Sequence, residues 1–375
     1  MQIKKKNFIL IIVGVFFAGA ILMGAVCATL LHSPGYAITS DEKLTEIKGY
    51  IDKYYLKEYD EKDLVEGAYE GYVAGLGDPY SNYMSKEDYE SWMASATGNY
   101  SGVGITFSEN EDGNFQVIEV NPGSPAEKAG VVPEDLILAV DGQTYTDSDV
   151  MAAAIRGKKG TEVTLILFHD GKEKEVKMMR DNIILQSVTW EMLDDSIGYI
   201  KISSFINNTG KEFKEALQAI EQNKAKGLIL DLRNNGGGLV DASVDVADEF
   251  LDEGVVCYVE DKNGNTETYK AYDGKTNIPA VILINESSAS ASEILAGALK
   301  DNGYEIVGTK SFGKGVIQTT IEMEDGSALK LTIMQYLSPD KHVIHEKGIK
   351  PTVKVKDKEK TEADEQLEKA EELLK

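Results

Sequence analysis

The sequence is poor in the residues that build disulfide-stabilised or metal-centred proteins. Its 375 residues include only two cysteines, Cys27 in an apolar N-terminal run and Cys257 in the strand-like stretch "GVVCYVE". The four histidines are scattered, and no cysteine or histidine spacing matches a metal site. We therefore expect no disulfide, no bound metal and no other cofactor.

Positive charge is also scarce. Lysine and arginine number 39 against 63 aspartates and glutamates, which gives a net charge of −24. Nucleic-acid binding needs clustered basic side chains that contact phosphates, so this class of partner is excluded. The acidic excess is typical of a solvated surface. The length suits two or three domains with cores of their own.

One long apolar run is present, at residues 8–31, directly after Lys4, Lys5 and Lys6. A signal peptide has an apolar region of about 7–15 residues, whereas a membrane-spanning helix needs about 20. Residues 1–37 therefore predict a cytoplasmic basic end and a single membrane anchor. Cleavage near Ala37 is the alternative. The remaining chain would face outward from the cell membrane.

Hydrophobic periodicity divides the rest of the chain into four regions. Residues 40–95 have helical spacing, interrupted by the turn-like "GLGDPYSNYM". Residues 96–182 change to a period of two and predict a compact β-rich unit with two helices. Residues 183–355 repeat strand–helix units, which indicate a mixed or parallel sheet covered by helices. Residues 356–375 predict a charged helix, which we expect to be solvated rather than to form a dimer contact.

Two glycine-containing stretches are candidate binding elements. "SGVGI" includes Gly102, Val103, Gly104 and Ile105, whose backbone N–H groups could form a nest for a peptide carboxylate. A plain turn before a strand is the simpler interpretation. "DLRNNGGG", at 231–238, either forms a tight strand–helix turn or presents an N–H to an oxyanion. A phosphate loop is disfavoured because no Lys-Ser or Lys-Thr pair follows.

The stretch "NESSASASEILAG", at 285–297, places four serines between a predicted buried strand and a predicted helix. Ser290 and Glu293 have the spacing of a capping box. The same strand-to-helix turn could instead expose a nucleophile, which needs a base. No histidine lies nearby, but "KSFGKGVIQ" offers Lys314, with Gln318 four residues later to orient its amine. Such a base requires burial that lowers its pKa by about 3 units, or roughly 4 kcal/mol.

Together these stretches resemble known families. "GSPAEKAGVVPEDLILAVDGQ" resembles the PDZ domains of bacterial proteases. The ordered motifs "DLRNNGGG", "NESSASASEILAGALKDNG" and "VGTKSFGKGVIQ" resemble the C-terminal processing peptidases, also called tail-specific proteases, over about residues 45–355. The resemblance implies a multidomain α/β protein: a membrane helix, a small helical segment, a PDZ domain and a ClpP/crotonase-like mixed α/β protease core.

The resemblance also implies roles for individual residues. Ser290 would be the nucleophile, Lys314 the base and Gln318 its partner, while the N–H groups of Ala291 and Gly237 would form the oxyanion hole. The PDZ domain would bind substrate C-termini at residues 102–105 and gate activity, and we expect Arg156, in "IRGKKG", to couple the PDZ domain to the active site.

The expected partners are protein substrates with accessible C-termini and the membrane of a bacterial envelope; a homodimer stays open. A catalytically silent PDZ scaffold is the main alternative, and a Ser–Lys enzyme of the signal-peptidase type is a second. The intact set of Ser290, Lys314 and Gln318 disfavours the scaffold. The PDZ-like stretch and the glycine loop disfavour the signal peptidase.

Overall fold

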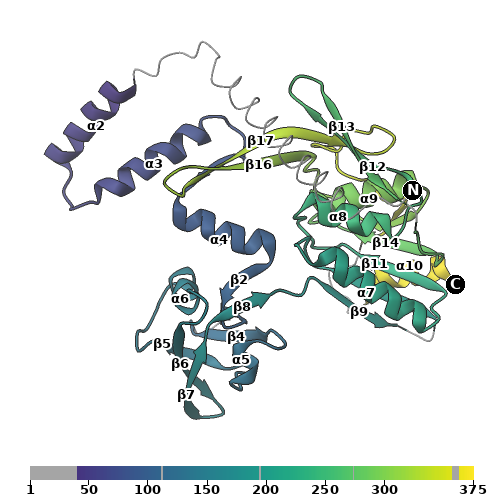
Figure 1. Ribbon diagram of the computed structural model, residues 1–375, viewed down its shortest axis with the longest axis horizontal. Coiled ribbons are helices and arrows are strands. Elements are labelled where there is room, and N and C mark those ends of the chain that lie inside the picture. Colours follow the sequence, from purple (N-terminus) through teal and green to yellow (C-terminus); the bar gives the residue numbers. More distant parts are fainter. Residues whose placement is uncertain (1–39, 111–112, 194–195, 273, 357–362) are drawn as a thin grey trace, which may run out of the picture. The chain divides into compact units, whose positions relative to one another are not determined.

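A computed structural model describes residues 40–110, 113–193, 196–272, 274–356 and 363–375 (Figure 1). The apolar run at 8–31, predicted to be a membrane anchor, lies outside these residues. Among the residues described, none of the helices has both the length and the apolar character needed to span a bilayer. The chain divides into two units, Met1–Val65 and Glu66–Lys375, which are considered separately below.

Helices dominate residues 40–97, as the spacing predicts. The first unit contains α2 (Ser40–Tyr54) and the beginning of α3 (Glu61–Ala74), and the second contains α4 (Lys86–Thr97). The predicted turn between α3 and α4 includes a short strand, β1 (Asn82–Met84). Ser85 caps the start of α4, because its hydroxyl accepts the Asp88 N–H at 3.2 Å.

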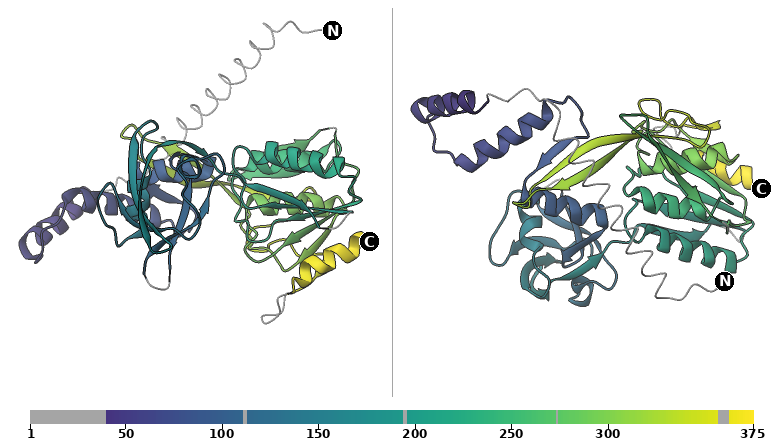
Figure 2. Two further views of the ribbon diagram at one scale, coloured as in Figure 1. Left: turned by 90° about the horizontal axis from the view of Figure 1, so that it is seen from below. Right: turned by 45° about the horizontal axis from the view of Figure 1, so that its top comes forward.

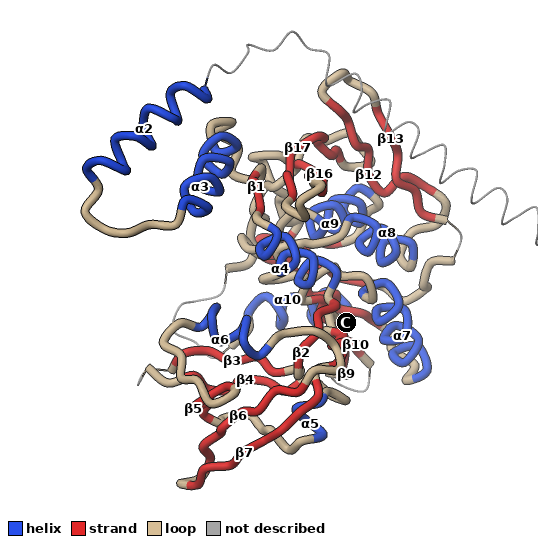
Figure 3. Tube along the Cα trace, turned by 60° about the vertical axis from the view of Figure 1, so that its left-hand side comes forward, coloured by secondary structure: helices blue, strands red, loops and turns tan. Residues whose placement is uncertain are grey.

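Residues 96–182 form an antiparallel sheet of five strands in the order β3-β4-β5-β6-β7 (Figure 3). These strands are β3 (Ile105–Glu109), β4 (Phe115–Val120), β5 (Leu136–Val140), β6 (Glu162–His169) and β7 (Lys172–Met179). Two helices, α5 (Pro125–Lys128) and α6 (Ser148–Ile155), complete the unit. After β5 the chain forms an isolated bridge between Val140 and Gln143.

Two further strands lead into and out of this unit. β2 (Asn99–Gly102) pairs antiparallel with β8 (Asp181–Ile184), so the chain enters and leaves the unit side by side. Arg180, just before β8, is buried and donates to the carbonyl oxygens of Ala154 and Ile155 at 2.7 and 2.9 Å. It therefore satisfies backbone groups that the end of α6 leaves open.

A six-stranded sheet in the order β18-β15-β14-β11-β10-β9 forms the centre of residues 183–355. Its strands are β9 (Val188–Met192), β10 (Ile197–Ile202), β11 (Gly227–Asp231), β14 (Ala280–Ile284), β15 (Glu305–Gly308) and β18 (Val353–Lys354). All neighbours pair in parallel except the edge strand β9, which is antiparallel. The predicted mixed α/β sheet is confirmed.

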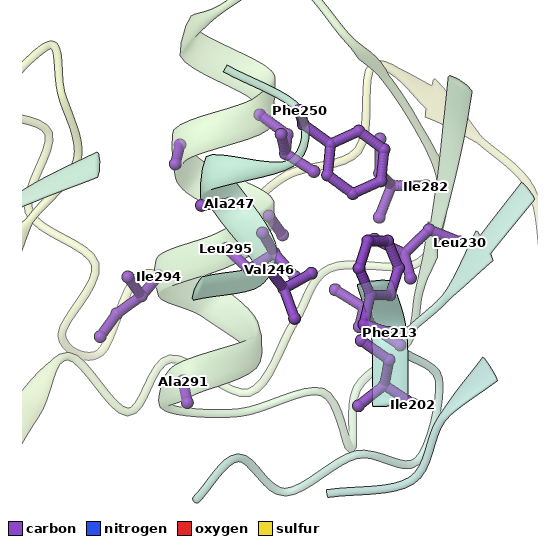
Figure 4. Close-up of a cluster of buried hydrophobic side chains, with 14 of the residues drawn as sticks. Ile202, Phe213, Leu230, Val246, Ala247, Phe250, Ile282, Ala291, Ile294 and Leu295 are labelled. Carbon is purple, nitrogen blue, oxygen red and sulfur yellow. The ribbon is translucent and has the colours of Figure 1, made fainter. Parts of the chain in front are cut away.

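Alternating strand residues bury both faces of this sheet. Leu230 and Ile282 face one side, which is covered by α7 (Thr209–Gln222), α8 (Val240–Asp248) and α9 (Ala291–Asp301). Figure 4 shows Phe213 and Phe250 between the strands and the helices. Their ring centroids lie 5.5 Å apart. Residues that point alternately to two buried faces explain why β14 is apolar throughout and why β11 is apolar up to Asp231, its last residue.

The opposite face is covered by α10 (Glu365–Leu374), the charged tail helix. Figure 2 shows this helix on the side of the sheet away from α7, α8 and α9. Ala370 is fully buried against strand residues that include Val281 and Leu283. The expectation of a solvated tail helix was therefore wrong, because its thin apolar stripe is enough to close the second face of the core.

A second sheet contains β1, from the turn between α3 and α4, together with strands from the C-terminal half of the chain. β17 (Ala328–Leu337) pairs with β16 (Val316–Glu322), with β12 (Gly254–Asp261) and with β1, and β13 (Thr266–Ala271) pairs with β12. The register of β1 places Tyr83 opposite Leu329. Residues just before β1 therefore lie beside β17, whose other edge pairs with β16, the strand that follows Lys314.

Candidate active site

Ser290 lies at the turn between β14 and α9, as the sequence predicts. Its φ of 56° is in the left-handed region, which side chains other than glycine seldom adopt and which costs on the order of 1–3 kcal/mol. It is half-buried, whereas Ala289 and Ala291 on either side are buried. The turn therefore presents this serine to solvent at the N-terminus of a buried helix.

The neighbouring serines are bonded elsewhere. The Ser288 hydroxyl donates to the Leu232 carbonyl oxygen at 2.8 Å, and the Ser292 hydroxyl donates to the Asn235 carbonyl oxygen at 2.9 Å. Both are buried, while Ser287 is exposed. Ser288 and Ser292 thus fasten the serine turn to the "DLRNNGGG" loop, and Ser290 is the serine of the group with the conformation of a nucleophile.

Glu293 connects the serine turn to the lysine loop. Its side chain is fully buried, and its Oε2 accepts the backbone N–H of Ser290 at 2.9 Å and that of Lys314 at 2.8 Å. Its Oε1 accepts the Gly313 N–H at 2.7 Å and the Ser311 hydroxyl at 2.5 Å. The predicted capping contact to the Ser290 N–H is present, but the bonds to the lysine loop are an additional role that its sequence position does not reveal.

Tyr336, on β17, holds the same two residues from another direction. Its ring is fully buried, and its single O–H donor is shared between the carbonyl oxygen of Ser290, at 3.0 Å, and that of Lys314. Burial raises the pKa of this phenol well above its ordinary value, so the hydroxyl stays protonated as a donor. Glu293 and Tyr336 together bring the backbones of the predicted nucleophile and base to one place.

Lys314 is half-buried between two glycines that the packing requires. A side chain at Gly315 would collide with the backbone of His345, and Gly313 has a φ of 97°. The Lys314 Nζ lies 5.0 Å from the centroid of the Tyr80 ring. Burial lowers the pKa of this amine, and the positive charge of Lys330 lowers it further. The direction predicted for a lysine base is therefore confirmed.

Gln318 lies on β16, next to a register shift between residues 317 and 318. Its Nε2 donates to the Thr332 Oγ1 on β17 at 3.1 Å. The side-chain amide of Gln318 is therefore held by β17. Gln318 itself follows Lys314 on the same stretch of chain, at the beginning of β16. Its predicted bond to the lysine amine stays a prediction.

The glycine loop approaches the serine turn closely. Gly237 has a φ of 103°, and a Cβ there would lie 2.7 Å from the Ala289 carbonyl oxygen and 3.0 Å from the Ala291 nitrogen. The Gly237 N–H donates to the Asn235 Oδ1 at 2.8 Å. Gly237 is thus placed beside the predicted oxyanion site, and its N–H would have to exchange this acceptor to serve an oxyanion.

A groove of about 320 Å³ lies between β3 and α6. Its walls include the predicted carboxylate-binding residues Val103, Gly104 and Ile105, and the α6 residue Ala152. β3 is an edge strand of its sheet, so a peptide could add beside it by main-chain hydrogen bonds. Gly102 leads into this segment at the end of β2.

Three family profiles match consecutive parts of the chain. The profile of Peptidase family S41 matches residues 196–355, that of the PDZ domain matches 101–179, and that of the activating protease CtpB N-terminal domain matches 32–88. The carboxy-terminal processing protease CtpA of Bacillus subtilis (strain 168) is 38% identical over 363 residues, which cover 94% of this chain and 78% of that protein. The chain belongs to peptidase family S41.

Two further similar proteins support this family assignment. A "Probable CtpA-like serine protease" of Staphylococcus aureus (strain COL) is 37% identical over 369 residues, covering 95% of this chain and 73% of that one. The solved photosystem II D1 C-terminal processing protease is 28% identical with a TM-score of 0.50, covering 82% of this chain and 85% of its own. This S41 chain is therefore a serine-type peptidase with a PDZ domain.

Arg156, the residue that we expect to couple the PDZ domain to the active site, lines the PDZ groove. It is exposed, follows the end of α6, and lines the groove together with Ala94 of α4 and Leu185. Its Nη1 lies 3.4 Å from the Ser91 hydroxyl on α4. The groove is therefore bounded in part by a helix outside the PDZ fold, and the coupling role of Arg156 stays a prediction.

One group of side chains has the composition of a cation site. Potential ligand atoms of Asp301, Asp340 and His342 lie within 4.8 Å of one another. The Asp301 carboxylate already accepts the Asp340 N–H at 3.0 Å. The Asp301 carboxylate therefore holds the loop after β17 against the end of α9, and we assign no metal to this group.

Proposed function

We propose that this serine peptidase cleaves proteins from or near their C-termini, with Ser290 as nucleophile and Lys314 as general base. The supporting observation is that two side chains each hydrogen-bond to both residues. Glu293 accepts the backbone N–H groups of Ser290 and Lys314, and the Tyr336 hydroxyl contacts both of their carbonyl oxygens. Two segments that are separate in the sequence are thus held together at a strained, half-buried serine. The names of the relatives, which include C-terminal processing proteases, support the substrate class.

In this mechanism the neutral Lys314 amine takes the proton of the Ser290 hydroxyl as its oxygen attacks the peptide carbonyl carbon. The C–N bond then breaks, and Lys314 returns the proton to the leaving amine. Water hydrolyses the acyl-enzyme with the same lysine as base. Gln318 keeps the amine oriented during both proton transfers.

The oxyanion would be held by backbone N–H groups. Ala291 is the first residue of α9, so its N–H belongs to a helix N-terminus, where negative charge is favoured. We assign the second donor to Gly237. The peptide at 236–237 would reorient when substrate binds and release the Asn235 contact.

The PDZ groove would capture a substrate C-terminus, with its carboxylate on the amides of residues 102–105 and its chain beside β3. Arg156 would report occupancy to α4 through Ser91. The domain would then act as a gate, because α4 continues from β1, which is paired with β17 beside the active site.

The deciding experiment compares the full chain with Ser290→Ala and Lys314→Ala on an unfolded protein that has an apolar C-terminus. Exposed neighbours supply matched controls, Ser287→Ala and Lys310→Ala. Loss of about 10³-fold or more in kcat/KM for the first pair alone supports the dyad. Cleavage by Ser290→Ala at the wild-type rate would refute it. If wild type itself does not cleave but binds C-terminal peptides, the scaffold alternative holds.

The location of the enzyme belongs to the same proposal. Residues 8–31 would anchor it in a bacterial cell membrane with the peptidase outside, where it could take part in signal transduction. The experiment is fractionation of cells that express the full chain or residues 38–375. Recovery of the full chain in the membrane fraction, with the catalytic part accessible to external protease, supports the anchor; equal distribution of the two forms contradicts it.

A homodimer is proposed from α2. Its apolar side chains Leu44, Ile47, Tyr50 and Tyr54 are between 45% and 68% exposed. Such a row is unusual on a solvated helix and suits a second copy of the chain. Sedimentation of residues 38–375 at several concentrations should show a dimer that Ile47→Glu dissociates, and a monomer at all concentrations would contradict the proposal.

A further inference from the structure

The turn before β1 lies at the predicted catalytic lysine. Tyr80 in this turn has its ring centroid 5.0 Å from the Lys314 Nζ, and the charge of Asp78 acts on the same amine. Both residues are half-buried. They come from the segment "GLGDPYSNYM", which the sequence alone marks only as a break between two helices.

A chain of hydrogen bonds connects this turn to Gln318. The Ser81 hydroxyl donates to the Asp78 Oδ2 at 2.5 Å and accepts the Thr332 N–H at 2.9 Å. The Thr332 Oγ1 in turn accepts from the Gln318 Nε2 at 3.1 Å. Asp78 also accepts the N–H of Tyr80 at 3.0 Å, so one carboxylate fixes both the ring beside the lysine and the strand that holds the glutamine.

Asp78 is suited to this role because it stays ionised. Its burial favours the protonated form, but hydrogen bonds from Ser81 and Thr332 outweigh that effect, and the net result is a lowered pKa. An ionised carboxylate accepts stronger hydrogen bonds than a neutral group and holds its donors in one geometry.

We propose that Asp78 is a positioning residue for the Lys314–Gln318 pair, and that the Tyr80 ring is the wall against which the lysine amine is held. This inference rests on the proposed function, since it concerns the same proton transfer. It assigns to the turn before β1 a part in the active site, because misplacing a reacting group by about 1 Å can cost about 10²-fold in rate.

The charges around Lys314 give this role a distinctive signature. Glu293 from α9 and Asp78 from the turn favour the charged amine, whereas burial and Lys330 from β17 favour the neutral one. Removing the charge of Asp78 therefore lowers the pKa of Lys314. The acid limb of the kcat/KM profile should move to lower pH even as kcat falls, which damage to packing alone would not produce.

The test uses the full chain with Asp78→Asn, which keeps the shape of the side chain. Asp325→Asn is the matched control, since Asp325 also accepts a serine hydroxyl in a turn, that of Ser327 at 2.6 Å. We expect Asp78→Asn to lower kcat about tenfold or more with KM nearly unchanged, and to shift the acid limb to lower pH. Asp325→Asn should keep both the wild-type kcat and the wild-type profile.

Two outcomes would overturn the inference: an unchanged kcat, or a reduced kcat with an unmoved acid limb. A fluorescent C-terminal peptide that binds the PDZ groove, with the thermal midpoint, reports whether each variant is folded. A second variant, Tyr80→Leu, should also lower kcat, and wild-type kcat there would remove the ring from the proposal. If Ser290→Ala still cleaves, the proposed function fails first; if Ser290→Ala is inactive while Asp78→Asn behaves as wild type, only the present inference fails.

Discussion

The buried carboxylate of Glu293 accepts the backbone N–H of Lys314 at 2.8 Å. The same oxygen accepts the N–H of Ser290 at 2.9 Å. One side chain thus sets the distance between the serine turn and the lysine loop. This contact explains how a serine and a lysine from separate motifs can be kept in register without a histidine between them.

Replacing Glu293 should damage stability and catalysis together. Glu293→Ala leaves the N–H groups of Ser290, Gly313 and Lys314 without their acceptor, and each buried unsatisfied group costs about 1–3 kcal/mol. We expect the free energy of unfolding, measured in urea, to fall by about 3 kcal/mol or more. Glu324→Ala, in an exposed turn, is the control. Similar unfolding curves for the two variants would show that Glu293 is not the connecting residue.

Substitutions at the adjacent Gly236 and Gly237 test whether the glycine loop must pack closely against the serine turn. A Cβ at Gly237 would lie 2.8 Å from the Ser290 Cβ, and φ there is 103°, whereas a Cβ at Gly236 meets nothing within 4 Å. Gly237→Ala should therefore lower kcat/KM at least tenfold and lower the thermal midpoint, because about 1 kcal/mol or more of strain must be relieved by moving the serine turn. Gly236→Ala should keep the wild-type midpoint. Equal midpoints for both variants would contradict the close approach of Gly237 to the serine turn.

A larger side chain at Ala152 should block the PDZ groove and so test whether peptides bind there. Ala152→Phe places a ring in a space of about 320 Å³ between α6 and β3. We expect the full chain carrying Ser290→Ala and Ala152→Phe to bind a fluorescent peptide with a free apolar C-terminus at least tenfold more weakly than Ser290→Ala alone. A peptide with an amidated C-terminus tests the carboxylate contact. Undiminished binding by the ring variant would place the peptide site elsewhere.

Arg156→Ala tests whether peptide binding in the PDZ groove is coupled to cleavage, rather than whether the groove binds peptide. Its guanidinium lies 3.4 Å from Ser91 on α4, so its loss should reduce the stimulation of cleavage by an added C-terminal peptide more than it reduces basal cleavage. Basal and stimulated rates are measured on the same fluorogenic substrate. Wild-type values for both rates would end the coupling hypothesis.

The tail helix offers a matched pair on one element. Ala370 is fully buried against the sheet, while Leu373 is 39% exposed. Ala370→Asp buries a carboxylate without a partner and should reduce the free energy of unfolding by at least about 2 kcal/mol. Leu373→Asp should change it by less than about 0.5 kcal/mol. If both variants unfold alike, α10 does not cover the sheet in solution.

The pH dependence of the enzyme should follow the lysine. Because the base must be neutral, kcat/KM should rise with pH through the lowered pKa of Lys314. Lys330→Met removes a positive charge that lowers this pKa, so the pKa rises and the acid limb moves to higher pH. Lys341→Met is the control, since the Lys341 Nζ lies 5.1 Å from the centroid of the Tyr258 ring, much as the Lys330 Nζ lies 5.6 Å from that of the Trp92 ring. A limb unmoved by Lys330→Met would exclude Lys330 from the electrostatics of the site.

Local patterns predict local features well in this chain. The buried strands β11 and β14, the amphipathic α7 and the strand-to-helix position of Ser290 follow from residues adjacent in the sequence. The burial of α10 was missed because a thin apolar stripe does not show which surface it covers. Tyr336, Asp78 and Thr332 were missed because their roles depend on pairing between distant strands. Glu293 was noticed only for its local capping bond, since its longer-range bonds have no sequence signal.

The bond between the Ser81 hydroxyl and the Thr332 N–H joins residues 251 positions apart. Such a contact forms late in folding, because a long loop must close before the contact is made. The intervening chain includes a PDZ unit and an α/β sheet with cores of their own. We therefore expect the turn that carries Ser290 to form before Tyr80 and Asp78 reach Lys314. If Asp78 and Tyr80 position the lysine as proposed, a newly made chain passes through a stage that is largely folded but not yet an active peptidase.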